Sequence, residues 1–227
     1  MENINLKNIR NKIFIRFALV PVVFALIFFL PAGTFYYWHA YIYSAVLIVP
    51  MCYVLFYFLK RNPAFLERRM KMREKELTQK VVIIVADILF LIGFLIPGFD
   101  FRFDWSNEPF WLVIFSNIMV LTSYIGCFFV FKENSYASRI VEVAEGQKVI
   151  STGPYAIVRH PMYNCVIVMS FFSPLALGSY YALIPLALVF PFLIVRILNE
   201  EKLLKKELPG YKEYCEKVKY RLFPYIW

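Results

Sequence analysis

Residues 110–131, FWLVIFSNIMVLTSYIGCFFVF, form an uninterrupted apolar stretch without one charged side chain. The hydrocarbon layer of a bilayer is about 30 Å thick, and a helix crosses it with about 20 apolar residues. A β-strand that crosses a membrane alternates in polarity, whereas this stretch is continuously apolar. A helix also satisfies its own backbone hydrogen bonds in lipid. The stretch therefore predicts a membrane-spanning helix.

The rest of the chain repeats this pattern. Of the 227 residues, 60% are hydrophobic and 19% aromatic, which is more apolar surface than one soluble core can bury. The further candidate spans are residues 12–31, 38–59, 81–98, 163–177 and 180–198. The last two are short and are divided by Gly178-Ser179, so they form either two tilted spans or a re-entrant hairpin. We predict an all-α, polytopic transmembrane helical bundle with five or six spans.

The charges predict how the bundle is oriented. Basic residues gather at the N-terminus (Lys7, Arg10, Lys12, Arg16), in residues 60–80 and from Lys132 to the end, whereas the loop at 99–109 is acidic. By the positive-inside rule, both termini and the 60–80 loop are cytoplasmic. The net charge of +9 then needs no nucleic-acid partner. The basic loop is interpreted as a topogenic signal that also contacts anionic lipid head groups, with substrate binding as the alternative.

The first span, at residues 12–31, follows basic residues as the apolar part of a signal peptide does. No small-residue cleavage site comes after Leu30, and more spans follow. We therefore expect the span to persist as a helix of an integral membrane protein.

The character of the chain changes at Glu133. We predict N-terminal transmembrane helices with the basic loop in residues 1–132, and a C-terminal cytoplasmic cofactor-binding region with a helical hairpin in residues 133–227. Around Glu145-Gly146 the pattern predicts a short extended excursion or hairpin. Pro161 follows Arg159-His160 and suits the first turn of a helix, where its missing N–H costs nothing.

Two polar groups flank the last pair of spans. Arg159-His160 precedes them, and Glu200-Glu201 follows them about one turn past the last apolar residues. Charges at that depth are costly unless they are paired or functional. If the spans fold back as a hairpin, both groups return to the same face. The alternative is an interfacial Arg159 beside a hydrogen-bonded His160.

The combination of these motifs resembles a known family. GPYAIVRHPMY at 153–163 is followed by the EE pair and then by Tyr211, Tyr214, Arg221 and Pro224. Over about residues 130–227 the chain is similar to the isoprenylcysteine carboxyl methyltransferase and phospholipid methyltransferase superfamily of integral membrane methyltransferases. RNPAFLERRMK at 61–71 is also similar to a loop of bacterial members. Cys165 stands where members commonly have glycine.

The resemblance implies S-adenosyl-L-methionine as the cofactor. Arg159 and Glu201 are the implied catalytic residues, with Arg159 orienting an anionic acceptor through its fork of donors. The implied cofactor-binding residues are Gly153, Pro154, Tyr155, Val158, His160, Pro161, Tyr163, Glu200, Glu201, Tyr211 and Tyr214. Tyr211, Tyr214, Phe223, Tyr225 and Trp227 would form a lid over the cofactor. An interfacial aromatic belt is the alternative for these aromatic residues.

The implied reaction is methyl transfer to a lipid-like or prenylated acceptor that enters from the bilayer, with an isoprenylcysteine-type carboxylate as the first choice. A carboxylate is already ionised at neutral pH, so exclusion of water and alignment are the main requirements. The alternatives are N-methylation of a phospholipid or other amphiphile, with a Glu as base, and a nicotinamide-dependent membrane reductase. Transport is disfavoured because the spans carry few charges.

The remaining polar residues are given simpler interpretations. Cys52, Cys127, Cys165 and Cys215 lack metal-type spacing, so free thiols and no metal are expected. Asp87 within a span is interpreted as an inter-helix partner of Arg16, with substrate binding as the alternative. His39 is interpreted as an interfacial residue.

Overall fold

The computed structural model describes residues 6–70, 77–138 and 140–227. The predicted basic residues Lys71, Arg73 and Lys75 lie outside the described residues, as do the side chains of Lys7, Arg10 and Lys12. The described part of the chain is helical and contains no strand. Its elements are α1 (Leu6–Ala32), α2 (Trp38–Arg61), α3 (Pro63–Met70), α4 (Leu77–Phe103), α5 (Phe110–Glu133), the 3₁₀ helix η1 (Gly153–Ala156), α6 (Pro161–Ala176), α7 (Leu183–Ala187), α8 (Val189–Glu207) and α9 (Tyr211–Lys217).

The predicted fold class is confirmed. Among the described residues, five helical segments are long and apolar enough to cross a membrane: Ile13–Ala32, Trp38–Arg61, Leu77–Phe103, Phe110–Glu133 and Leu183–Glu207. The last segment combines α7 and α8. The remaining predicted span is the shorter apolar helix α6, so the count of five or six spans depends on how α6 is treated.

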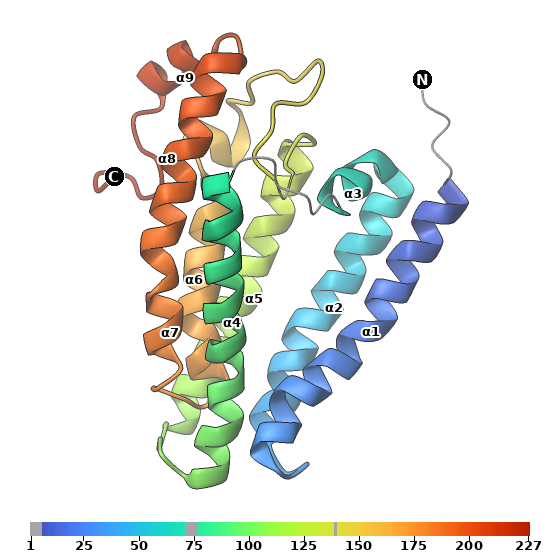
Figure 1. The fold of residues 1–227 in the computed structure, drawn as a ribbon, viewed down its shortest axis with the longest axis vertical. Coiled ribbons are helices and arrows are strands. Elements are labelled where there is room, and N and C mark those ends of the chain that lie inside the picture. Colours follow the sequence, from blue (N-terminus) through green and yellow to red (C-terminus); the bar gives the residue numbers. More distant parts are fainter. Residues whose placement is uncertain (1–5, 71–76, 139) are drawn as a thin grey trace.

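The helices run back and forth between two ends of the molecule (Figure 1). α1 packs along α4, and α5 packs along α6, while α4 also contacts α7 and α8. α3, the segment that follows α5, and α9 lie toward the end where α1 begins and α8 finishes. We call this the α3–α9 end. It is the end that the charge pattern predicts to be cytoplasmic.

The turn between α6 and α7 lies at the opposite end and is held by neighbouring helices. Gly178 has a φ of +75°, and a Cβ there would lie 2.8 Å from Nε2 of His39 on α2. Only glycine combines this backbone conformation with so close an approach. The predicted break at Gly178-Ser179 is therefore a tight turn that is packed against α2.

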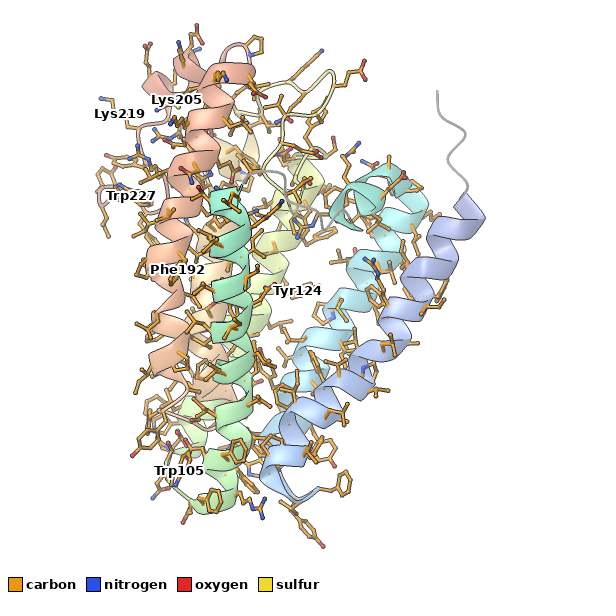
Figure 2. The ribbon with its side chains drawn as sticks, viewed as in Figure 1. Trp105, Tyr124, Phe192, Lys205, Lys219 and Trp227 are labelled. Atoms are coloured by element: carbon orange, nitrogen blue, oxygen red, sulfur yellow. The ribbon has the colours of Figure 1, made fainter. Side chains whose placement is uncertain are left out.

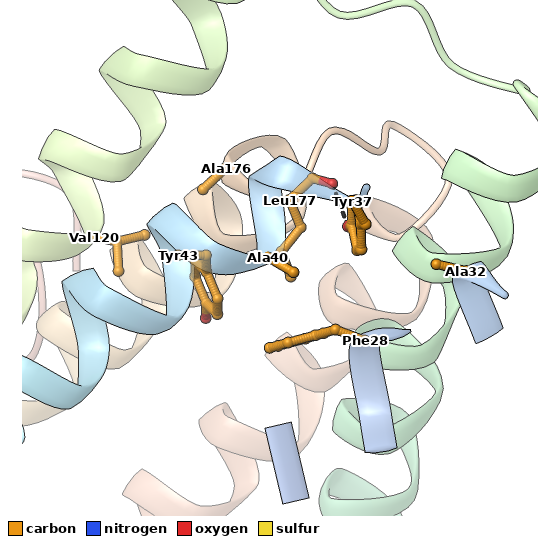
Figure 3. Packing of buried hydrophobic residues seen from close by; sticks show 8 residues of the cluster. All are labelled: Phe28, Ala32, Tyr37, Ala40, Tyr43, Val120, Ala176 and Leu177. Atoms are coloured by element: carbon orange, nitrogen blue, oxygen red, sulfur yellow. Dashed lines mark hydrogen bonds between the residues drawn. The ribbon is translucent and has the colours of Figure 1, made fainter. Parts of the chain in front are cut away.

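A hydrophobic core fills the same end of the bundle (Figure 3). Tyr37 donates to the carbonyl of Leu177 at 2.5 Å, and Tyr43 donates to Ser173 Oγ at 2.8 Å. These bonds satisfy phenol groups that would be costly to bury alone. The buried members of the core are Phe28, Ala32, Tyr37, Ala40, Tyr43, Val120, Ala176 and Leu177.

The acidic loop is shorter than predicted, because α4 continues through Asp100 to Phe103. Asp100 is buried, accepts from Ser106 N and Oγ at 2.7 Å each, and is also bonded to Ser179 Oγ. A fully paired carboxylate can extend a helix where hydropathy alone predicts its end. Trp105 lies in the loop after α4, at the end of the molecule opposite Lys205 and Lys219 (Figure 2).

Close packing of α1 on α4 depends on Gly98. A Cβ at this position would lie 2.8 Å from both the Phe28 carbonyl oxygen and Pro31 Cβ. Gly98→Ala is therefore expected to lower the free energy of unfolding by about 1–3 kcal/mol through overpacking. Thermal unfolding of the detergent-solubilised protein tests this, with the exposed Leu91→Ala on the same helix as control. Equal midpoints for Gly98→Ala and wild type would contradict it.

The chain forms a turn around Glu145-Gly146, where a short extended excursion or hairpin was predicted. No strand forms around Glu145-Gly146 in the described segment 140–150, although Gln147 N donates to the Ala144 carbonyl at 3.0 Å. This segment is therefore a turn without the paired strands of a β-hairpin.

Arg16 on α1 and Asp87 on α4 both occupy exposed positions, and the contact between them stays a prediction.

Candidate functional site

The residues before α6 are joined to the C-terminal tail by backbone hydrogen bonds. Arg159 N donates to the Tyr220 carbonyl, and His160 N donates to the Arg221 carbonyl, both at 2.9 Å. α6 begins at Pro161, as predicted. Because α8 ends at the same side of the bundle, the tail returns Arg221 to the neighbourhood of Glu201.

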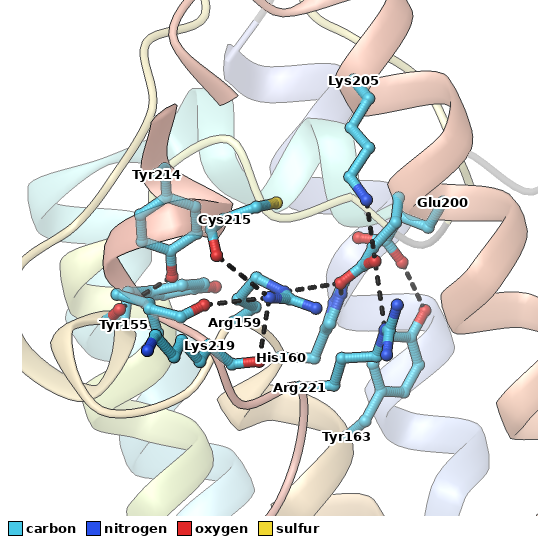
Figure 4. Close-up of polar contacts among 12 residues, drawn as sticks. Tyr155, Arg159, His160, Tyr163, Glu200, Lys205, Tyr214, Cys215, Lys219 and Arg221 are labelled. Atoms are coloured by element: carbon cyan, nitrogen blue, oxygen red, sulfur yellow. Dashed lines mark hydrogen bonds and ion pairs between the residues drawn. The ribbon is translucent and has the colours of Figure 1, made fainter. Parts of the chain in front are cut away.

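Glu201 is the buried centre of an ionic cluster, and its partners Arg159, His160, Lys205 and Arg221 are labelled in Figure 4. Its side chain is 3% exposed, and Oε1 accepts from Arg159 Nε at 2.6 Å and lies 3.3 Å from His160 Nε2. Oε2 accepts from Arg221 Nε at 3.1 Å and lies 3.7 Å from Lys205 Nζ. The predicted convergence of Arg159-His160 with the EE pair is thus present. We call these five residues the Glu201 cluster.

Arg159 also binds the tail. Its NH1 group donates to the carbonyls of Val218 at 2.9 Å and Lys219 at 3.1 Å, and it lies 3.5 Å from the carbonyl of Cys215. These acceptors and Glu201 surround a guanidinium that is 6% exposed. The contacts fix the tail on the start of α6.

A second polar group lies beside the Glu201 cluster. Tyr163 on α6 donates to Glu200 Oε2 at 2.7 Å, and Arg196 Nε donates to the Tyr163 hydroxyl at 3.0 Å. Arg196 NH1 also donates to Oε1 of the buried Gln79 at 3.1 Å. Arg196 and Glu200 share one face of α8, since they are one turn apart. The group therefore links α4, α6 and α8.

A pocket opens at the α3–α9 end, with about 890 Å³ of space including its mouth. One wall is the segment after α5, which contributes Asn134, Tyr136, Ser138 and Glu142, and another comes from α8 and α9. The predicted site residues that line it are Tyr155, Arg159, His160, Tyr163, Glu200, Tyr211 and Tyr214.

The other predicted site residues lie outside the lining. Glu201 is behind it in the ionic cluster, and Val158 is buried. Pro161 forms the first turn of α6, and Gly153-Pro154 opens η1. Gly153 has a φ of +57°, and a Cβ there would lie 3.1 Å from Glu133 Cδ, so this glycine is required by the turn. The structure thus places these residues around the pocket as its support.

The tyrosines of the pocket differ in their partners. Tyr214 donates to the Tyr155 carbonyl at 2.7 Å, and Asn134 Nδ2 donates to the Tyr155 hydroxyl at 3.0 Å. Burial raises the pKa of Tyr155 to about 12. The Tyr211 hydroxyl is buried and has no hydrogen-bond partner among the described residues, and burial raises its pKa. Tyr211 therefore presents a neutral, unsatisfied hydroxyl.

The C-terminal aromatic residues are arranged differently from the expected lid. Phe223 and Trp227 pack on the buried side chains of Tyr163, Ile197 and Leu222. The Arg221 guanidinium lies 5.1 Å from the Trp227 ring centroid, while Tyr225 is 90% exposed. Of the five expected lid residues, Tyr211 and Tyr214 line the pocket among the described residues.

Sequence reasoning missed Arg196 and Asn134, which both line the pocket. Arg196 had an available signal, because its spacing of four residues from Glu200 places the two on one helical face. Asn134 carries no comparable pattern. Its place depends on how the segment after α5 folds back.

The comparison with protein families agrees with the geometry. A family model described as isoprenylcysteine carboxyl methyltransferase (ICMT) matches residues 111–206. This range begins in α5, contains the Arg159-His160 and Glu200-Glu201 pairs, and ends near the end of α8. Residues 111–206 are therefore similar to the isoprenylcysteine carboxyl methyltransferase family, which confirms the predicted resemblance and favours a membrane methyltransferase.

Proposed function

We propose that the protein transfers a methyl group from S-adenosyl-L-methionine to the carboxylate of an isoprenylcysteine-type acceptor. One observation carries the proposal. Glu200, Arg196 and Tyr211 all line one pocket at the end of a membrane bundle, and the buried Tyr211 hydroxyl has no hydrogen-bond partner among the described residues. An acidic, a basic and a neutral hydrogen-bonding group thus converge where a water-soluble cofactor and a lipid acceptor can meet.

The residues of the pocket fit the cofactor. Its ammonium group and ribose hydroxyls need acceptors such as the Glu200 carboxylate, and its carboxylate needs a donor such as the Tyr211 hydroxyl. Leu203, Leu204 and Leu208 also line the pocket and offer an apolar surface for a base ring. When bound, the cofactor supplies an activated methyl group on a positively charged sulfur.

Arg196 is the residue that we propose to orient the acceptor carboxylate. A guanidinium binds a carboxylate through two parallel hydrogen bonds. Two of its acceptors, the Tyr163 hydroxyl and Gln79 Oε1, are uncharged, and a hydrogen bond to a carboxylate is about twice as strong as such a neutral bond. Arg159 is instead held by Glu201 and the tail carbonyls. The orienting role first expected of Arg159 therefore fits Arg196 better.

The reaction requires no general base, since a carboxylate is ionised at neutral pH. The chain has to align the two reactants and to exclude water from between them. Tyr163 on α6 contributes by accepting a hydrogen bond from Arg196 Nε, and Glu200 in turn accepts one from the Tyr163 hydroxyl. A pocket at the membrane boundary also allows a prenylated acceptor to keep its chain in lipid.

Methyl transfer tests the proposal directly. The purified protein is incubated with methyl-labelled S-adenosyl-L-methionine and an S-prenylated N-acetylcysteine, with the methyl ester of the same acceptor as control. We expect label in an alkali-labile product from the free acid and none from the ester. Alkali-stable label would favour N-methylation. Absence of transfer together with absence of cofactor binding would overturn the proposal.

Tyr211→Phe tests the predicted cofactor contact. Removing a buried hydroxyl that has no partner should leave the unfolding midpoint unchanged or slightly raised. If the hydroxyl binds the cofactor, the same change should weaken cofactor binding by about tenfold. Calorimetric titration measures the affinity, with Tyr220→Phe in the tail as control. Unchanged affinity in Tyr211→Phe would exclude the contact.

A further inference from the structure

The basic stretch of α3 lies against the pocket. We propose that α3 is a clamp in which Arg68 and Arg69 hold the pocket wall, defined as residues 134–138, in the shape that binds the cofactor. The inference rests on the proposed function, because it takes the pocket as the cofactor site. It assigns a positioning role to arginines that the charge pattern alone explains by topology and lipid contact.

α3 is itself fixed to the bundle. Asn62 precedes it, and its Oδ1 accepts from Phe65 N at 3.1 Å, which satisfies a free donor at the start of the helix. Phe65 is 1% exposed. Its ring centroid lies 4.4 Å from that of Phe58 on α2 and 5.4 Å from that of Phe131 on α5. α3 can therefore act as a rigid support for its two arginines.

Arg68 grips one carbonyl of the wall with two donors. Its Nε and NH2 groups donate to the Ser135 carbonyl at 3.1 and 2.8 Å. The guanidinium also lies 6.0 Å from the ring centroid of Tyr136. Both guanidinium nitrogens are needed for these two hydrogen bonds, so the contact depends on the shape of the arginine side chain as well as on its charge.

Arg69 joins the wall to α6. Its NH1 group donates to the Ser138 carbonyl at 3.3 Å and lies 3.9 Å from Met162 Sδ, which is also in the pocket lining. Its guanidinium lies over the Phe131 ring, 4.7 Å from the centroid. One side chain thus contacts the end of α5, the wall and the first turn of α6.

The wall needs such partners because it has no helix or strand of its own. Its backbone carbonyls must find other donors when they are shielded from water. The Ser135 and Ser138 carbonyls find the arginines, while Asn134, Tyr136, Ala137 and Ser138 line the pocket. Loss of the clamp should therefore loosen the pocket on the side where Asn134 contacts Tyr155.

A matched control separates the clamp from a role of charge alone. Arg61 lies in the same basic stretch at the end of α2 and is exposed. A topogenic or lipid-binding role predicts the same effect for Arg61→Ala and Arg68→Ala, because each removes one positive charge. A clamp predicts an effect only for Arg68→Ala. Arg68→Lys keeps the charge and loses the fork.

The experiment measures S-adenosyl-L-methionine affinity of the full-length protein in detergent by calorimetry. We expect binding about tenfold weaker for Arg68→Ala, an intermediate loss for Arg68→Lys and no change for Arg61→Ala. Equal affinities for Arg68→Ala and Arg61→Ala would overturn the clamp, as would full recovery in Arg68→Lys, since charge would then suffice.

Amide hydrogen exchange tests the clamp independently of the proposed function, because it needs no bound cofactor. Arg68→Ala should increase exchange in residues 134–150, whereas Arg61→Ala should leave it unchanged. If wild type fails to bind the cofactor and Arg68→Ala still loosens the wall, the proposed function fails and the clamp remains. If wild type binds the cofactor and neither affinity nor exchange changes in Arg68→Ala, the clamp fails alone.

Discussion

Glu201→Ala is expected to lower the free energy of unfolding by about 3–5 kcal/mol, because it removes the carboxylate from a buried ion pair and leaves the other charge unpaired. Arg159 and Arg221 both donate to Glu201, and the Arg159 guanidinium is 6% exposed. The tail carbonyls would still bind Arg159 but carry no full negative charge. The C-terminal tail keeps these bonds but loses the one between Arg221 and Glu201, so it should be held less firmly at the start of α6 in this variant.

Thermal unfolding in detergent measures the effect, with the reactivity of the free cysteines as the signal that is monitored. Glu207→Ala, at an exposed position of the same helix, is the control and should lie within about 0.5 kcal/mol of wild type. Arg159→Ala combined with Glu201→Ala should cost less than the sum of the single changes, since neither charge is then left alone. A Glu201→Ala midpoint equal to that of Glu207→Ala would show that the cluster adds nothing to stability.

The spans were predictable because a bilayer imposes one simple rule on every helix that crosses it. The residues at which the spans begin and end were less predictable. Residues 81–98 were predicted where α4 runs from Leu77 to Phe103, since hydropathy stops at polar residues such as Gln79 and Asp100. Both side chains are buried and hydrogen-bonded to residues of other segments. Sequence alone does not reveal such partners, so it predicts a helix that is too short at both ends.

The site was predictable to the level of its motifs. The convergence of Arg159-His160 with Glu200-Glu201 followed from folding the last spans as a hairpin. The sequence did not predict which glutamate of the EE pair faces the pocket and which one forms the ionic cluster. Successive helical residues point about 100° apart, so Glu200 faces the pocket while Glu201 lies behind it. Which of the two faces inward depends on the rotation of α8, which tertiary packing decides.

The same reasoning explains why Arg68 was given a different interpretation. Positive charge in a cytoplasmic loop is expected for topology alone, so an arginine there carries no visible sign of a second role. The bonds of Arg68 to the Ser135 carbonyl join residues that are far apart in sequence. Only the fold brings them together.

Arg196→Ala is expected to lower the rate of methyl transfer by about 100- to 1,000-fold, which is the usual cost of removing a group that positions reacting atoms or stabilises their charge. The affinity for S-adenosyl-L-methionine should stay within about twofold, because Glu200 and Tyr211 remain in the pocket. Steady-state kinetics with varied acceptor, together with calorimetry for the cofactor, measures the two effects separately.

Arg196→Lys and Arg159→Lys distinguish the two candidate arginines. Lysine keeps the charge but not the planar fork, so Arg196→Lys should recover only part of the activity. Arg159→Lys should act mainly on stability, because the fork there holds Glu201 and the tail carbonyls. If Arg159→Lys instead lowers transfer at unchanged stability while Arg196→Ala does not, the acceptor carboxylate binds Arg159. The pocket would then receive its acceptor beside the tail, and Arg196 would serve to fix Tyr163 and Gln79.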